Sequence, residues 1–212
     1  MSTAVQKGRT LFQVLLDALK KPEPAPKAPA VDLYNPLKLS LGGFVKIATP
    51  DYIAYTFSIE MMSEFTRQIA KRTLKFVDYS LFDPDRGQDG TYITLRVIPQ
   101  DDGKLDCLLL RPKDELPFSK ELQKALKGKE LVDNESQVKY TMRASHKASI
   151  REAKADGSVN RLQVEYWDFI NEEEQQPRFY VVEMDLSDRE GMIQTYTGSL
   201  IAKEDVKPVG SH

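Results

Sequence analysis

The sequence has few of the residues that metal sites and nucleophilic enzymes need. Its 212 residues include one cysteine, Cys107, and two histidines. A single cysteine excludes an internal disulfide, and so few Cys and His side chains disfavour a zinc site, which takes three or four ligands. The formal net charge of −2 gives no basic excess for nucleic-acid binding. No apolar run approaches the roughly 18 residues of a membrane-spanning helix, and no signal peptide is recognisable. We therefore expect a cytoplasmic protein with no nucleic-acid partner.

Catalytic motifs are also missing. His146 lies in the polar stretch from Ala144 to Lys147 and is expected to be exposed, whereas Cys107 lies among leucines and is expected to be a buried strand residue. Gly42-Gly43 lacks the Lys-Ser/Thr of a phosphate-binding loop. The loop with Asp83, Asp85 and Asp89 departs from the EF-hand spacing, so a solvated loop is favoured over a calcium site. We expect no enzymatic activity, no cofactor and no metal.

A pattern of aromatic, acidic and glycine residues occurs twice. Asp78-Tyr79 and Phe82 precede an acidic loop, a strand opening at Tyr92 and a turn ending at Gly103. The second copy has the same order and lies 87 to 88 positions later, at Glu165-Tyr166, Phe169, Tyr180 and Gly191. The repeat predicts two similar β-meander modules and argues against a scaffold built around one catalytic cleft.

The first thirty residues differ from the rest of the chain. Residues 1–20 are expected to form an amphipathic helix, because apolar residues recur at spacings of three and four: Leu11, Phe12, Leu15, Leu16 and Leu19. Residues 21–30 carry four prolines and predict a semi-rigid linker. The helix could dock in the groove of a protein partner, contact a membrane surface peripherally, or pack on its own body.

The rest of the chain predicts an α+β fold that is mainly antiparallel β, with one or two packed helices. We expect a first module at 31–117, a connecting helix at 118–130 capped by Ser119, a second module at 131–206 and a tail or cloning remnant at 207–212. In the strand from Thr91 to Pro99, Tyr92, Thr94, Arg96 and Ile98 share one face. Residues 51–72 are ambiguous, because Tyr52 to Phe57 favour a strand whereas Ile59 to Ala70 could form a helix.

Aromatic residues gather in the second module. Tyr166 and Trp167 stand next to each other in a strand, so they should point to opposite faces, and only one of them is expected in the core. With Arg178, the exposed face could form a ligand groove between the two modules. The alternative is an ordinary cross-strand aromatic pair.

A short motif at the start of the body carries a family resemblance. Asn35-Pro36-Leu37, followed by Leu41-Gly42-Gly43 and Val45, resembles the opening motif of the bacterial family of unknown function typified by YjfK. The aromatic-acidic segment from Tyr79 to Val97, a tryptophan in the C-terminal half and a final hairpin are also similar, but Ile59 to Lys75 does not align. The resemblance covers roughly residues 9–206 and implies no catalytic residue. It implies an accessory role in envelope stress or membrane maintenance, beside phage-shock-type coiled-coil proteins.

Two functions are therefore open from the sequence. The first is a non-enzymatic cytoplasmic adaptor that docks through its N-terminal helix on a protein partner or on the inner membrane surface. The second is a module that binds a small ligand or peptide in an aromatic groove. A third and weaker alternative is a hydrolase in which carboxylates such as Asp78 and Glu165 meet.

Overall fold

The computed structural model describes residues 32–49, 52–83, 92–173, 176–187 and 191–209. By its contacts the chain divides into two units, Met1–Ala30 and Val31–His212. The expected N-terminal helix and linker, and most of the acidic loop at 84–91, lie outside the described residues. No helix among the described residues is long and apolar enough to cross a membrane.

Antiparallel strands dominate the described part of the second unit, as the sequence predicts. One sheet contains eleven strands, in the order β11-β1-β2-β3-β4-β5-β10-β9-β8-β7-β6. The strands are β1 (Phe44–Thr49), β2 (Tyr52–Ile69), β3 (Arg72–Phe82), β4 (Tyr92–Pro99), β5 (Leu105–Pro117), β6 (Glu130–Val132), β7 (Lys139–Lys154), β8 (Val159–Asn171), β9 (Arg178–Asp185), β10 (Met192–Ile201) and β11 (Val206–Val209). One short α-helix, α2 (Lys120–Lys127), and one 3-10 turn (Lys203–Asp205) complete the described elements.

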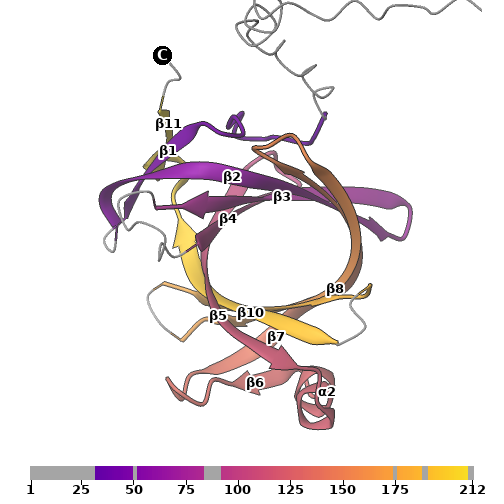
Figure 1. Ribbon diagram of the computed structural model, residues 1–212. Helices are drawn as coiled ribbons and strands as arrows, with labels where there is room; N and C mark the ends of the chain where they lie inside the picture. Colours follow the sequence, from indigo (N-terminus) through magenta and orange to yellow (C-terminus); the bar gives the residue numbers. More distant parts are fainter. Residues whose placement is uncertain (1–31, 50–51, 84–91, 174–175, 188–190, 210–212) are drawn as a thin grey trace, which may run out of the picture. The chain divides into compact units, whose positions relative to one another are not determined.

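The sheet closes on itself. β2 also pairs with β7, from Met61 opposite Lys154 to Thr66 opposite Ser149. β5 pairs with β10, so two runs of four consecutive strands, β2–β5 and β7–β10, join at both sides into a ring. Figure 1 shows this ring viewed along its axis. A closed ring of about eight strands has an interior just wide enough to be filled by side chains or to hold one small ligand.

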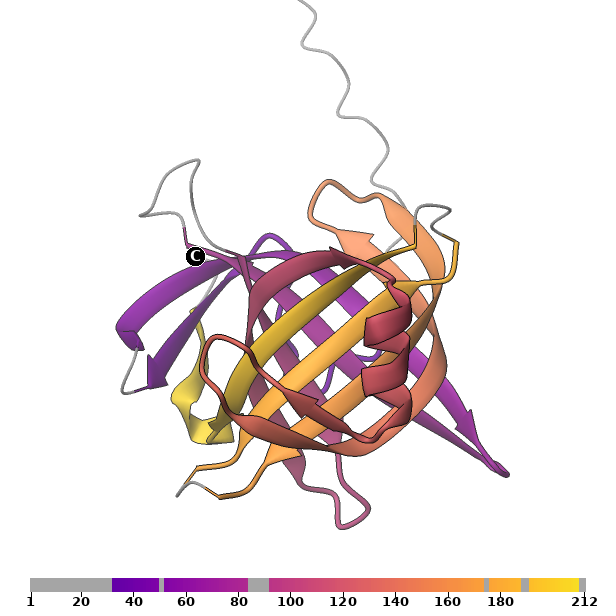
Figure 2. The ribbon, with the colours of Figure 1, turned by 90° about the horizontal axis from the view of Figure 1, so that it is seen from below.

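Both halves of the ring are covered on the outside. β1, β11 and the segment before β1 pack on β2–β5, where Val45, Tyr79 and Leu95 are buried. α2 and β6 pack on β7–β10, where Trp167 and Phe169 are buried (Figure 2). The parts of the wall beneath these covers therefore have two buried faces, one toward the interior and one beneath the cover, whereas β7 keeps exposed residues at alternate positions.

This double burial settles the ambiguous segment at 51–72. Residues 52–69 form the single long strand β2, so the helical alternative for Ile59 to Ala70 is wrong. Met62 packs under the outer cover while Phe65 packs inside the ring, so both faces carry apolar residues and the alternation typical of a half-exposed strand is lost. A bulge between Ile59 and Met61 further breaks the period.

Other boundaries also differ from expectation. The connecting helix begins at Lys120, and Ser119 caps it as predicted by accepting a hydrogen bond from the Leu122 amide. The polar stretch from Ala144 to Lys147 is the middle of the sixteen-residue strand β7. Residues 207–209, expected in a tail, belong to β11 and pair with β1.

Candidate functional site

A buried charge network lies inside the ring. Arg96 of β4 is 2% exposed and forms a two-pronged contact with Asp78 of β3. Nε of Arg96 is 2.9 Å from Oδ1 of Asp78, and Nη2 is 2.7 Å from Oδ2. Arg96 also reaches the other half of the ring, where Nη1 is 3.4 Å from Oδ1 of Asp168 on β8 and Nη2 donates to Oε1 of Glu183 on β9. One guanidinium thus connects three carboxylates from both runs of strands.

Aromatic rings cover the guanidinium of Arg96. Its central carbon lies 5.0 Å from the ring centre of Phe76 and 5.3 Å from that of Phe65. These two rings are stacked with centres 4.4 Å apart, and Tyr166 meets both edge-on. Cation–π contacts of this kind strengthen when they are shielded from water.

The network shifts the pKa values of its members. Burial acts to lower the pKa of Arg96, but Asp78, Glu183 and Asp168 outweigh it and hold that pKa well above its ordinary value. Burial raises the pKa of Glu183 to about 7; Arg96 opposes this rise, while Asp78 and Asp168 add to it. Burial also raises the pKa of Asp168, against the effect of Arg96. The pKa of Glu183 therefore lies near neutrality.

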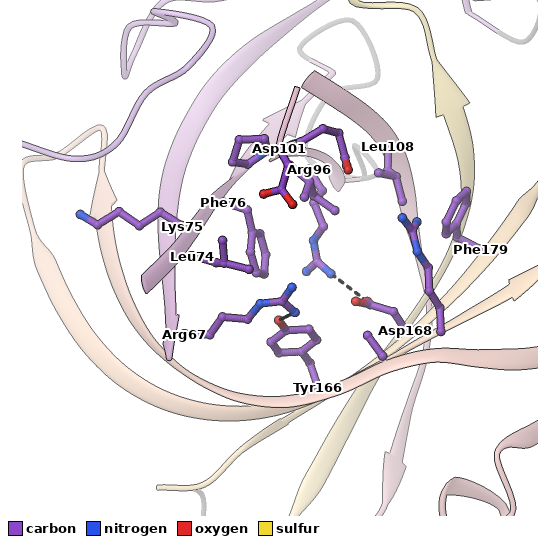
Figure 3. A pocket seen from close by; sticks show the side chains of 15 residues that line it. Arg67, Leu74, Lys75, Phe76, Arg96, Asp101, Leu108, Tyr166, Asp168 and Phe179 are labelled. Carbon is purple, nitrogen blue, oxygen red and sulfur yellow. Dashed lines mark hydrogen bonds and ion pairs between the residues drawn. The ribbon is translucent and has the colours of Figure 1, made fainter. Parts of the chain in front are cut away.

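A cavity of about 210 Å³ lies inside the ring on one side of Arg96. Figure 3 shows its lining, with Arg67, Tyr166, Arg96 and Asp168 converging. Its apolar wall is formed by five residues from four strands: Leu74, Phe76, Ile98, Leu108 and Phe179. Apolar walls with a few convergent polar groups are typical of small-molecule sites.

Two polar side chains form a pair in this cavity. Nη1 of Arg67 on β2 donates to the hydroxyl of Tyr166 on β8 over 2.8 Å. Among the described residues, Arg67 forms no ion pair, and its Nε is buried without a hydrogen-bond partner. Burial raises the pKa of Tyr166 to about 12, against the effect of Arg67, so the hydroxyl keeps its proton at neutral pH.

A β-bulge adds a third arginine to the lining of the cavity. The pairing of β7 with β8 shifts register between Met142 and Ala144, and the extra residue is Arg143. Both Arg143 and Ala144 line the cavity, although adjacent residues of a regular strand point to opposite faces. Bulges commonly redirect a side chain in this way next to functional sites.

Two further hollows border the described body. One of about 490 Å³ lies on the other side of Arg96 along β4, is more open to solvent, and includes Tyr92, Thr94 and Tyr196 in its lining. The other, of about 440 Å³, lies on the outer surface beside α2 and includes Leu126, Met142 and Trp167. Neither contains an arginine in its lining.

The structure separates the aromatic residues proposed as one groove. Tyr166 points into the ring, Trp167 lies on the outer face beneath α2, and Arg178 is exposed at the start of β9. The expectation that only one of Tyr166 and Trp167 is in the core is wrong, because they are 0% and 7% exposed and both faces of β8 are covered. Of the three, only Tyr166 lines the interior cavity.

The other predicted residues are placed as follows. Leu11, Phe12, Leu15, Leu16 and Leu19 lie outside the described residues. Cys107 is buried at 1% exposure, as expected, and burial raises the pKa of its thiol to about 11.

His146 is half-buried with its ring centre 5.8 Å from that of Tyr166, so the expectation of an exposed side chain is wrong. Asp78 faces the interior of the ring, whereas Glu165 lines the hollow on the outer surface beside α2, so these two carboxylates do not meet.

Five charged residues of the interior were not predicted as site residues from the sequence: Arg67, Arg96, Arg143, Asp168 and Glu183. Arg96 stood in a predicted strand, but an alternating strand with polar residues on one face normally has that face in water. Only closure of the sheet turns this face inward. A search for charged residues on the polar faces of several strands could have found Arg96 and Glu183, but not the bulge at Arg143.

Comparison with known proteins gives no identification: no protein-family model, no curated protein and no solved structure matches the chain. The resemblance to the YjfK family stays a prediction.

Proposed function

We propose that the described body is a small-molecule-binding module whose ligand occupies the cavity between Arg67, Tyr166 and Phe76. The observation that carries this proposal is the cavity of about 210 Å³ inside a closed ring, where apolar side chains and the polar side chains of Arg67, Tyr166 and Arg143 converge. A dry cavity of about 150 Å³ accommodates benzene, so a ligand with one small ring fits this space. The ligand-binding alternative from the sequence is thereby moved from a groove between the two modules, at Tyr166, Trp167 and Arg178, to the interior of the ring.

Rigidity of the wall also supports a binding role. The cavity residues stand on strands that are paired on both sides, and the Arg96 network ties β3, β4, β8 and β9 together. Sites built on such elements hold their polar groups in place before the ligand arrives, which lowers the entropic cost of binding.

A fragment screen by NMR on the ¹⁵N-labelled full chain tests this proposal. We expect saturable shifts for amides of β2, β7 and β8 around the cavity. Ala144→Phe would fill the cavity and abolish these shifts, whereas Lys147→Phe, at an exposed position three residues along the same strand, would leave them unchanged. Fragments that bind the wild type and Ala144→Phe equally would contradict the proposal.

We also propose that the runs β2–β5 and β7–β10 are related modules. Each is four consecutive antiparallel strands, and the turns before β5 and β10 contain Gly103 and Gly191 at φ +81° and +64°. The register of the sequence repeat needs correction, because it matches Tyr79, which faces the outer cover, with Tyr166, which faces the interior. A shift of one residue exchanges the two faces of a strand. The two modules therefore correspond in the order of their strands, but not in the residue-by-residue alignment that places Tyr79 on Tyr166.

The adaptor function remains a second proposal, carried by the amphipathic pattern of residues 3–20 on a proline-rich linker. Its partner would be a protein with a hydrophobic groove, with a phage-shock-type coiled-coil protein as the candidate implied by the resemblance, or the inner membrane surface. Replacing Leu15 and Leu16 by Asp should abolish co-purification of that partner or lipid without changing the far-UV spectrum. Unchanged co-purification would refute this function and leave the ligand-binding proposal untouched.

A further inference from the structure

We propose that the ligand of the interior cavity is a small organic carboxylate, an aromatic or branched acid, held by Arg67, Tyr166 and Arg143. This inference rests on the proposed function and adds the chemical class of the ligand. The unused donors, the charges and the apolar wall of the cavity support it.

The donors converge on one part of the cavity. Arg67 uses Nη1 for Tyr166, which leaves Nη2 without a hydrogen bond to a described residue and Nε buried without a partner. A guanidinium N–H donates a charge-assisted hydrogen bond to a carboxylate oxygen. Tyr166 accepts from Arg67 through its oxygen, so its own proton is available to a ligand oxygen. Nη2 of Arg67 and the Tyr166 hydroxyl therefore remain as two donors for one anionic group.

Charges at the cavity favour an anion over a neutral ligand. Arg143 lines the cavity next to Ala144 and has no ion-pair partner among the described residues. The other two charged residues of the lining that lie toward the rim have partners, since Lys75 pairs with Glu64 over 3.3 Å and Asp101 with Arg72 over 3.8 Å. Arg67 is half-buried and likewise forms no ion pair with a described residue, so a carboxylate placed between these two guanidinium groups would give both a close anionic partner.

The interior carboxylates set a condition on this binding. Asp78, Asp168 and Glu183 carry three formal negative charges, which balance the positive charges of Arg67, Arg96 and Arg143. A further carboxylate would leave one negative charge in excess unless an interior carboxyl group took up a proton. Glu183 is the group placed to do so, because Arg96, Asp78, Asp168 and the Tyr196 hydroxyl surround it and its pKa is about 7. Binding of the acid anion should therefore be coupled to proton uptake.

The remaining wall restricts the rest of the ligand. Phe76, Ile98 and Leu108 offer no hydrogen-bonding side chain, so the part of the ligand beyond its carboxylate should be apolar. The cavity volume of about 210 Å³ limits this part to about one ring or a short branched chain.

Isothermal titration of the full chain with sodium benzoate and with benzamide, its neutral counterpart, tests the inference. We expect benzoate to bind at least tenfold more tightly than benzamide at pH 6. Arg67→Gln should remove this preference while benzamide binding stays the same, and Arg161→Gln, at an exposed arginine of β8 outside the cavity lining, should leave it intact. The affinity for benzoate should fall as the pH rises above 7. Proton uptake on binding should appear as a heat of binding that depends on the buffer used.

Three results would overturn the inference. Equal affinities for benzamide and benzoate at the cavity would show that the site does not distinguish a charged ligand from a neutral one. The proposed ligand-binding function would then still stand. If inorganic phosphate competed with benzoate at equal affinity, the apolar part of the ligand would contribute nothing to binding, and the assignment to organic acids would be wrong. Absence of saturable benzoate binding up to ~100 mM would refute the carboxylate as the ligand class. The proposed ligand-binding function would be refuted as well only if every fragment bound Ala144→Phe as it binds the wild type.

Discussion

The guanidinium of Arg96 meets the carboxylate of Asp78 edge to edge, with Nε 2.9 Å from Oδ1 and Nη2 2.7 Å from Oδ2. This two-pronged geometry is the strongest arrangement of an arginine and a carboxylate, and here it joins adjacent strands from inside the ring. The same guanidinium then contacts Asp168 and Glu183 on the opposite wall, so it links the two halves of the sheet.

Removal of Arg96 should destabilise the protein severely. Arg96→Met keeps much of the side-chain volume but leaves three carboxylates inside the ring without their shared cation. Breaking a buried ion network by removing one partner costs about 3–5 kcal/mol. Urea unfolding would measure the loss, and Arg72→Met is the control, because Arg72 and Asp101 are 78% and 91% exposed at their side chains. A loss for Arg96→Met no larger than for the control would contradict a structural role for the network.

Glu183 should make stability decrease with rising pH. The pKa of Glu183 rises from 4.5 to about 7 on folding, so the folded state binds its proton more tightly than the unfolded state does. The resulting stabilisation is complete below about pH 4.5 and is lost as the pH rises through about 7. At about 1.4 kcal/mol per unit of pKa, the decrease is on the order of 3 kcal/mol at most.

Urea unfolding at intervals from pH 5 to pH 8 would measure this decrease. Glu183→Gln keeps an oxygen that accepts from Arg96 and carries no charge at any of these pH values. The variant should therefore lose the part of the pH dependence that belongs to Glu183. Identical slopes of the free energy of unfolding against pH in the variant and the wild type would exclude Glu183 as the titrating group.

Gly198 should not tolerate a side chain. It stands on β10 opposite Leu110 of β5, at one of the two seams that close the ring. A Cβ atom there would lie 2.1 Å from the carbonyl oxygen of Leu109, which is backbone and cannot rotate away. Gly198→Ala should cost about 1–3 kcal/mol by overpacking and lower the melting temperature. Gly103→Ala, where the space is open but φ is +81°, is a comparison in which backbone strain acts without a clash.

Asn35 should be coupled to Tyr79 in stability. The Tyr79 hydroxyl donates to Oδ1 of Asn35 over 2.6 Å, and the Asn35 amide donates to the Leu39 carbonyl over 2.7 Å. Asn35 thus holds the segment that covers the outer face of β3. In a double-mutant cycle with Asn35→Ala and Tyr79→Phe, we expect a coupling free energy of about 1 kcal/mol. Additive losses would show that this contact does not hold the cover in place.

The sequence motif that carries the family resemblance has a structural role in this body. Asn35 orders the covering segment, Gly42 has φ +72°, and a Cβ on Gly43 would lie 2.9 Å from the Ser40 carbonyl oxygen. These requirements explain the residues of the motif by folding rather than by ligand contact. Val45, the last residue of the motif, is fully buried beneath the same cover.

Local chemistry in the sequence determined much of the secondary structure. The alternation from Tyr92 to Pro99 gave β4, Ser119 marked the start of the helix, and Gly103 and Gly191 marked turns, because these signals depend on neighbours along the chain. The sequence also determined that Cys107 is buried, since it stands among leucines.

Tertiary structure alone decided where the polar faces point. Closure of the ring through β2 and β7 turned Arg96, Asp78 and Glu183 inward, and the outer covers buried Trp167 on the opposite side of the same wall. The sequence cannot specify this by periodicity, because a strand with an alternating pattern is the same whether its polar face meets water or a closed interior. Pairing between strands about ninety residues apart makes that choice, and with it the cavity and the unused donors of Arg67.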